Sequence, residues 1–191
     1  MNVTALWYLE TAPWYALGAY WALSALRVKP TKINEGAAGR LLHIGVMALA
    51  FVLLASHRLA VGFLGRRFVP EIFPLRDFGI FLTFVGAGIA IWARYCLGQY
   101  WSARVTLKVD HRLIRSGPYA HVRHPLYSGL LVAMAGTALV VGEWRALIAL
   151  LVTILEFSRK ATKEEALLST EFNDDYREYR KQTGFLTPRF R

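Results

Sequence analysis

The chain has a single cysteine, Cys96, among its 191 residues. One thiol excludes a disulfide within the chain and a metal site built from several cysteines. Acidic residues are also scarce, because 13 Asp and Glu stand against 23 Lys and Arg. No nucleotide-binding glycine fingerprint occurs: Gly86 and Gly88 lie inside a long apolar run, not between a strand and a helix. We therefore expect neither a Rossmann fold nor a P-loop.

Apolar residues dominate what remains. They make up 55% of the chain, charged residues only 19%, and the net charge is +10. A basic chain of ordinary polarity would suggest nucleic acid as a partner, whereas a basic chain this apolar favours the lipid bilayer. We expect no nucleic-acid partner.

Five apolar runs follow one another, at 3–26, 41–64, 78–97, 126–142 and 146–157. At 1.5 Å per residue the longer runs can cross a hydrocarbon core of about 30 Å. The sequence thus predicts an all-α integral membrane protein with about five transmembrane helices, the last two forming a hairpin. His57 and Arg58 fall in the last third of the second run, where Arg58 is expected to reach the headgroups.

Lysine and arginine are distributed unevenly between the connections. Four lie in 27–40 and six in 98–124 with Arg94 included, against three in 65–77 and one in 143–145. By the positive-inside rule the N-terminus is outside, and the 98–124 loop and the C-terminal segment are cytoplasmic. We expect one structural unit, with a three-helix scaffold in 1–97 and a cofactor-binding catalytic region in 98–191.

Residues 111–129 are the most polar part of this apolar sequence, with three of the five histidines. Pro125 suits the first turn of a helix, which holds His124 outside the helix and leaves backbone N–H groups for an anion. Glu164 and Glu165 offer carboxylates on the same aqueous side for an ammonium or ribose hydroxyls. Together these residue types favour a zwitterionic ligand that contains a nucleoside.

A metal site is the alternative for the same stretch. His111, His121 and His124 are clustered, but Pro125 opposes a regular helix across them, and no clear third and fourth ligands follow. We expect no metal.

At these residues the sequence resembles the isoprenylcysteine carboxyl methyltransferase family and its relatives, the membrane phospholipid N-methyltransferases. The matching stretches lie in order along residues 95 to 191. They are Gly98-Gln-Tyr-Trp-Ser102, His111-Arg-Leu-Ile114, Ser116-Gly-Pro-Tyr119, Arg123-His-Pro-Leu-Tyr127 with Gly129, Lys163-Glu-Glu165, and Glu171-Phe-Asn-Asp-Asp-Tyr176 with Tyr179 and Pro188.

The resemblance implies a cofactor, S-adenosyl-L-methionine, which becomes S-adenosyl-L-homocysteine, and a lipophilic substrate that enters from the bilayer. The implied cofactor contacts are His111, Arg112, Leu113, Ile114, Tyr119, His124, Pro125, Leu126, Tyr127 and Glu164. The family's substrate-side arginine falls at Lys160, so Arg159 beside it is a second candidate for that role. Glu165 or a tyrosine is the candidate to take a proton from an amine substrate.

Three other functions stay open from the sequence. A phospholipid N-methyltransferase would act on a headgroup amine instead of a prenylcysteine carboxylate. A membrane sterol-type reductase carries a similar Arg-His-Pro-x-Tyr pattern and uses NADPH, but such proteins are longer. A small transporter or scaffold would use the same charged residues as conduit or interface groups.

Overall fold

The computed structural model describes residues 3–26, 28, 31–34, 36–101, 106–108 and 112–189. Helices form nearly all of this part of the chain, and two short strands pair as an antiparallel ribbon. The elements are α1 (Val3–Ala25), β1 (Thr31–Asn34), α2 (Ala37–Ala55), η1 (His57–Leu59), α3 (Phe73–Leu97), η2 (Gly98–Tyr100), β2 (Thr106–Lys108), η3 (Gly117–Ala120), α4 (Pro125–Val141) and α5 (Trp144–Gln182).

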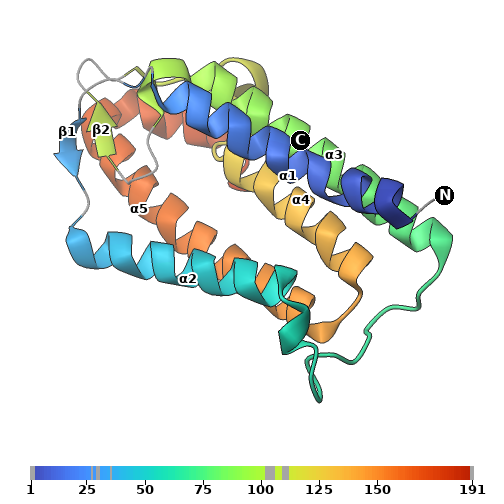
Figure 1. Ribbon diagram of the computed structural model, residues 1–191. Coiled ribbons are helices and arrows are strands. Elements are labelled where there is room, and N and C mark those ends of the chain that lie inside the picture. Colours follow the sequence, from blue (N-terminus) through green and yellow to red (C-terminus); the bar gives the residue numbers. More distant parts are fainter. Residues whose placement is uncertain are drawn as a thin grey trace.

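The long helices pack in two groups. Helix α3 lies along α4 and carries α1 on another side, whereas α2 packs mainly on the long α5 (Figure 1). The α4–α5 turn joins the two groups as a hairpin, as the sequence predicted. The β1–β2 ribbon lies at one end of the bundle (Figure 1).

Small residues set the distance between α3 and α4. A Cβ atom on Gly86 would collide with the backbone nitrogen of Ala133, and one on Gly129 would lie 2.6 Å from the nitrogen of Ala90. The two backbones therefore touch directly, as small residues allow between membrane helices. Gly88, two residues after Gly86 in α3, has no atom within 4 Å of the place where a Cβ would be added.

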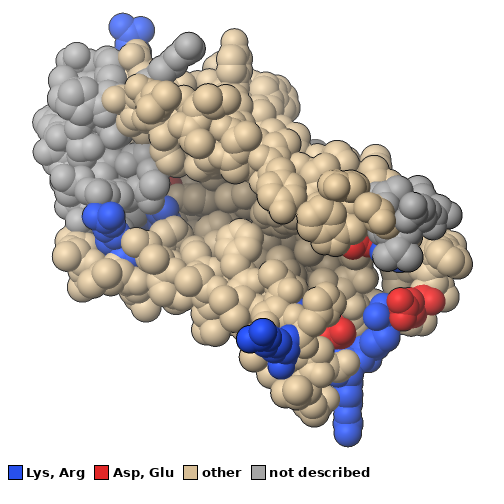
Figure 2. Space-filling view, viewed as in Figure 1, with Lys and Arg blue, Asp and Glu red and all other residues tan. Residues whose placement is uncertain are grey.

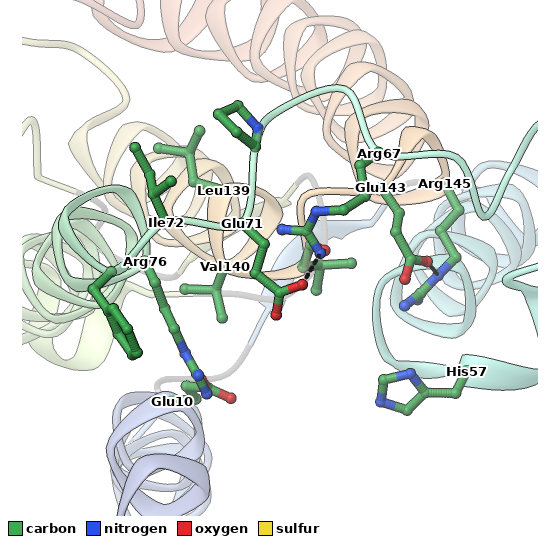
Figure 3. Close-up of a pocket in the computed structure, with 13 residues that line it drawn as sticks. Glu10, His57, Arg67, Glu71, Ile72, Arg76, Leu139, Val140, Glu143 and Arg145 are labelled. Atoms are coloured by element: carbon green, nitrogen blue, oxygen red, sulfur yellow. Dashed lines mark hydrogen bonds and ion pairs between the residues drawn. The ribbon is translucent and has the colours of Figure 1, made fainter. Parts of the chain in front are cut away.

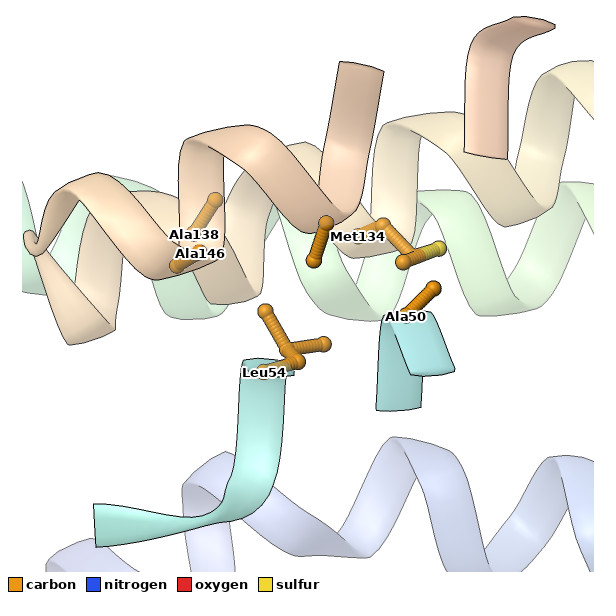
Figure 4. Packing of buried hydrophobic residues seen from close by; sticks show 6 residues of the cluster. Ala50, Leu54, Met134, Ala138 and Ala146 are labelled. Atoms are coloured by element: carbon orange, nitrogen blue, oxygen red, sulfur yellow. The ribbon is translucent and has the colours of Figure 1, made fainter. Parts of the chain in front are cut away.

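A second contact joins α2 to the α4–α5 hairpin. Its buried side chains are small or flexible, so three helices approach one another closely (Figure 4). They are Ala50, Leu54, Met134, Ala138, Ala146 and Ala149.

Helices α2 and α3 are long and apolar enough to cross a membrane, and α4 is a shorter apolar helix. Large apolar side chains project outward from α2 and α3, as lipid-facing surfaces require. Exposed examples are Leu41, Leu42, Leu49 and Phe51 on α2, and Phe78, Phe81, Phe84 and Trp92 on α3. On the face in Figure 2, charged side chains gather mostly toward the two ends, and uncharged surface covers the middle.

Three boundaries differ from the sequence prediction. Helix α2 ends at Ala55, so His57 and Arg58 lie beyond it in η1 and not within a span. Helix α3 begins earlier than expected, at Phe73, because a proline is tolerated in a first helical turn. Helix α5 extends to Gln182 but changes direction at Asn173, whose φ of 43° and ψ of −114° are not helical.

Candidate functional site

The site begins where the chain enters α4. Pro125 is the first residue of the helix, and His124 before it has φ −124° and ψ 56°, outside helical geometry. This places a buried imidazole against two consecutive carboxylates of α5. His124 Nε2 lies 3.3 Å from Glu165 Oε1, and His124 Nδ1 lies 3.6 Å from Glu164 Oε2.

Tyr127 connects the first turn of α4 to the same carboxylates. Its hydroxyl donates a 2.6 Å hydrogen bond to Glu164 Oε1. Its ring stacks on His124 at 5.7 Å and on Phe157 at 4.8 Å between centroids. The two aromatic contacts fix the ring, so the orientation of Glu164 follows from the position of α4 on α5.

Glu165 is held by cations. Arg123 Nε donates to Glu165 Oε1 at 2.6 Å, and Arg180 lies 3.6 Å from the other carboxylate oxygen. Burial alone would raise the pKa of Glu165, but hydrogen bonds from His124 and Arg123 outweigh it and lower the pKa to about 2. Burial disfavours the imidazolium of His124, yet Glu164 and Glu165 outweigh this too and raise its pKa.

The segment after α5 closes this side of the site by backbone pairing. The amide nitrogen of Arg123 donates to the carbonyl of Gly184 at 2.9 Å, and that of His124 donates to Phe185 at 3.2 Å. The Ser128 hydroxyl donates to the carbonyl of Leu186 at 2.5 Å. The Phe185 ring packs edge-on against His124, with centroids 5.2 Å apart.

After the bend at Asn173, Tyr176 and Tyr179 of α5 pack next to the site. The Tyr179 hydroxyl donates to the carbonyl of Tyr119 at 2.7 Å, and burial raises the pKa of Tyr179 to about 12. The buried Tyr176 hydroxyl has no hydrogen-bond partner within the described residues. This orphaned buried hydroxyl interacts electrostatically with Glu165, Arg123 and Arg180, which fits a site for a polar ligand.

The structure brings together most of the residues predicted to bind the cofactor. These residues lie at the start of α4, pack against it, or contact it from α5. They are Ile114, Tyr119, His124, Pro125, Leu126, Tyr127 and Glu164. Arg112 is exposed and Leu113 half-buried on the approach to Ile114, and His111 lies outside the described residues. The assignment of the whole set to a cofactor stays a prediction.

The two candidate substrate-side cations differ in environment. Arg159 Nε and Nη2 donate to the two oxygens of Glu156, at 2.7 and 2.6 Å. Lys160 is buried, with Nζ 3.5 Å from His43 Nε2 and 5.7 Å from the centre of the Tyr127 ring. His43 and Glu156 were missed by the sequence analysis, although an ionisable residue within an apolar run signals a functional position.

Arg123 and the 183–186 segment were also missed as parts of the site. Arg123 was quoted within a motif, but its role depends on Glu165, which is far away in the sequence. The 183–186 segment acts mostly through backbone groups, which every residue has, and its one aromatic contact comes from Phe185. No side-chain pattern therefore marks it.

A cavity of about 630 Å³ lies at the other end of α4 (Figure 3). Its acidic and basic side chains pair within the cavity wall, as Glu10 with Arg76, Arg67 with Glu71 and Glu143 with Arg145. The buried Arg145 also donates to the carbonyls of Leu53 and Leu54. The 57–72 loop is held against the α4–α5 turn by other bonds, in which Arg67 donates to the carbonyl of Val141 and the amide of Phe68 donates to that of Gly142. This contact lies about 25 Å from His124 by the length of α4.

Comparison with known proteins places the motif residues in context. Residues 79–170 match the sequence pattern of the isoprenylcysteine carboxyl methyltransferase (ICMT) family. The chain is 35% identical over 102 residues to a protein-S-isoprenylcysteine O-methyltransferase of Schizosaccharomyces pombe, covering 46% of this chain and 43% of that protein. It is 27% identical over 146 residues to a probable protein-S-isoprenylcysteine O-methyltransferase of Oryza sativa subsp. indica, covering 70% of this chain and 76% of the rice protein.

The fold also has a known counterpart. The structure of the eukaryotic intramembrane Ras methyltransferase ICMT matches with a TM-score of 0.58 at 21% identity, over 82% of this chain and 54% of that one. This chain thus spans less than half the length of the yeast relative and about half of the solved structure. The matched region contains His124, Tyr127, Glu164 and Glu165. Over residues 79–170 the chain is similar to the isoprenylcysteine carboxyl methyltransferase family, which is the family that its motifs resemble.

Proposed function

We propose that this protein is an S-adenosyl-L-methionine-dependent membrane methyltransferase that methylates the carboxylate of an isoprenylcysteine. The observation that carries the proposal is the contact of His124 and Tyr127 with Glu164, which joins the Arg123–Tyr127 motif to the Lys163–Glu165 motif. The names of the relatives support the reaction, and the outward apolar faces of α2 and α3 support a membrane setting.

The residues present fit the proposed cofactor. When bound, its sulfonium supplies an activated methyl group: the S–CH₃ bond breaks, its electron pair stays on the sulfur, and a C–O bond forms at the acceptor. Glu164 offers an anionic oxygen to the ammonium or ribose hydroxyls, and the positive N-terminal end of α4 favours the carboxylate. The orphaned hydroxyl of Tyr176 is a further hydrogen-bonding group, near Glu165 and Arg123.

The acceptor is proposed to be a carboxylate because the site has a poor base. An amine acceptor must lose a proton, and Glu165 or a tyrosine was the candidate to take it. The pKa of Glu165 is about 2, so its carboxylate is a weak base. The carboxylate also accepts hydrogen bonds from Arg123 and His124, which compete with a proton from an amine. A carboxylate needs no base, so catalysis rests on alignment and exclusion of water. We assign Glu165 a structural role in holding Arg123 and His124.

The lipid portion of the acceptor would reach the site from the side. Figure 2 shows a hollow between the surface formed by α1 and that formed by α2. Trp21 from α1 and Met47 from α2 pack on the cluster that contains Tyr127 and Phe157. An apolar chain in this hollow would therefore end near Tyr127, where Lys160 offers a cation to the carboxylate.

The cytoplasmic placement of this site is part of the proposal. The 98–124 connection and the residues after Phe157 carry the most Lys and Arg, six with Arg94 included and eight. His124 lies in the first of these regions and Glu164 in the second, so we expect both residues on the same aqueous side of the membrane. Labelling of introduced cysteines with a membrane-impermeant reagent in sealed vesicles tests this placement.

Binding and turnover together test the function. Calorimetry of the detergent-solubilised protein is expected to detect S-adenosyl-L-homocysteine but not NADPH. Labelled S-adenosyl-L-methionine is expected to transfer its methyl group to N-acetyl-S-farnesylcysteine, not to phosphatidylethanolamine. His124→Ala and Glu164→Ala should each weaken S-adenosyl-L-homocysteine binding, with Glu71→Gln at the far cavity as the unaffected control. Unchanged affinity in both variants, or transfer to the phospholipid alone, would refute this function.

A further inference from the structure

Four ionisable side chains meet between α2 and α5, and for two of them, His43 and Glu156, the sequence analysis assigned no role. They are His43 on α2, and Glu156, Arg159 and Lys160 on α5. Helix α2 is a candidate membrane span with many exposed apolar side chains. Ionisable groups at such positions are costly to bury, and they therefore mark functional sites.

Hydrogen bonding fixes the tautomer of His43. The Lys160 ammonium can only donate, so His43 Nε2, 3.5 Å away, is the acceptor. The proton is then on Nδ1, which donates to Glu156 Oε1 at 2.9 Å. His43 thus connects the carboxylate of Glu156 to the ammonium of Lys160 and links α2 to α5.

The same cluster separates the two cations. Glu156 accepts from both Nε and Nη2 of Arg159, which holds the guanidinium along α5 by an i,i+3 contact. Lys160 instead is buried between His43 and the face of the Tyr127 ring. Since Tyr127 donates to Glu164, Lys160 is the cation beside the proposed cofactor contacts.

We propose that His43 is a positioning residue of the methyl-acceptor site. It holds the Lys160 ammonium beside Tyr127, where Lys160 receives the acceptor carboxylate, while Glu156 keeps Arg159 out of that role. The inference rests on the proposed function and deepens it: α2, which lies outside the family-matched region, sets the selectivity of the enzyme for a carboxylate.

Steady-state kinetics of the full-length protein in detergent, with N-acetyl-S-farnesylcysteine and S-adenosyl-L-methionine, tests this role. His43→Ala is expected to raise the KM of the acceptor about tenfold, as loss of a positioned charge-assisted contact predicts. The KM of S-adenosyl-L-methionine should stay at its wild-type value. His43→Gln, which keeps a donor and an acceptor, should restore most of the acceptor KM. His57→Ala, at the far cavity, is the matched control.

A double-variant cycle adds a readout that a purely structural role would not change. Lys160→Met should raise the acceptor KM at least as much as His43→Ala, and the combined variant should be no worse than Lys160→Met alone. Additive effects, an unchanged acceptor KM in His43→Ala, or an equal rise for both substrates would overturn the inference while the function stands. A wild-type protein that methylates no prenylcysteine would overturn the proposed function, and this inference with it.

Discussion

The Tyr127 hydroxyl and the Glu164 carboxylate form a 2.6 Å hydrogen bond between the first turn of α4 and the middle of α5. The bond satisfies one oxygen of Glu164 and leaves the other near His124 Nδ1, at 3.6 Å. An aromatic side chain therefore orients the carboxylate that the proposed cofactor would contact, and each member can be tested on its own.

Tyr127→Phe should weaken S-adenosyl-L-homocysteine binding about tenfold. A hydrogen bond to a charged group contributes about 1.5–3 kcal/mol, and each 1.4 kcal/mol changes an affinity about tenfold. The ring and its stacking on Phe157 remain, so the thermal midpoint should change little. Calorimetry measures the affinity, and Tyr95→Phe on the exposed face of α3 is the control. Equal affinity for Tyr127→Phe and wild type would rule out this orienting role.

Glu165→Gln should destabilise the protein strongly. The substitution removes the charge that Arg123 and His124 contact, and loss of one member of a buried ion pair costs about 3–5 kcal/mol. Tryptophan fluorescence during denaturant or thermal unfolding measures the loss. Asp174→Asn is a matched control on the same helix, because its pair with Arg177 is exposed and contributes at most about 1 kcal/mol. If both variants unfold alike, the cluster contributes no special stability.

Stability should depend on pH through two groups of this cluster. The folded-state pKa of Glu165 is depressed to about 2, so its contribution is present above its ordinary pKa near 4.5 and is lost as pH falls from there toward 2. The pKa of His124 is raised from 6.5, so its contribution is present below 6.5 and is lost as pH rises through the raised value. Unfolding midpoints measured across pH should therefore fall on both sides. His124→Gln should lose the alkaline decline and keep most of the acid one; a wild-type-like alkaline profile would contradict the assignment.

The α3–α4 contact predicts opposite effects for two glycines of one helix. Gly86→Ala places a Cβ against the backbone of Ala133, and overpacking of this kind costs about 1–3 kcal/mol. Gly88→Ala meets nothing within 4 Å and should be neutral or stabilising by up to about 1 kcal/mol. Thermal midpoints in the same detergent compare the two. Because α4 carries Tyr127 at its first turn, Gly86→Ala should also weaken S-adenosyl-L-homocysteine binding, whereas loss in Gly88→Ala alone would contradict this packing.

Much of the helical arrangement could be predicted because its signals are local. Apolar runs gave α1, α3, α4 and the α4–α5 hairpin to within a few residues, and the His124-Pro125 pair marked the start of α4. Hydropathy alone placed the end of α2 too late, since residues after Ala55 are apolar yet leave the helix. The number of spans and their orientation stay predictions.

The parts of the site that were missed depend on contacts between distant segments. Nothing near His43 in the sequence indicates Glu156, which lies 113 residues away. Beyond the bend at Asn173, Tyr176 and Tyr179 are buried. A single non-helical residue changes which face of the following turns meets the protein, and the hydrophobic pattern alone does not reveal it.

The backbone pairing of residues 121–124 with Gly184 and Phe185 also sets an order of events during synthesis. All the residues of α1 to α4 are synthesised before Gly184 and Phe185. Until then the amide groups of Arg123 and His124 lack these acceptors, and His124 lacks the ring of Phe185. The helices can thus enter the bilayer one after another, whereas the proposed cofactor pocket is completed only after translation has passed Leu186.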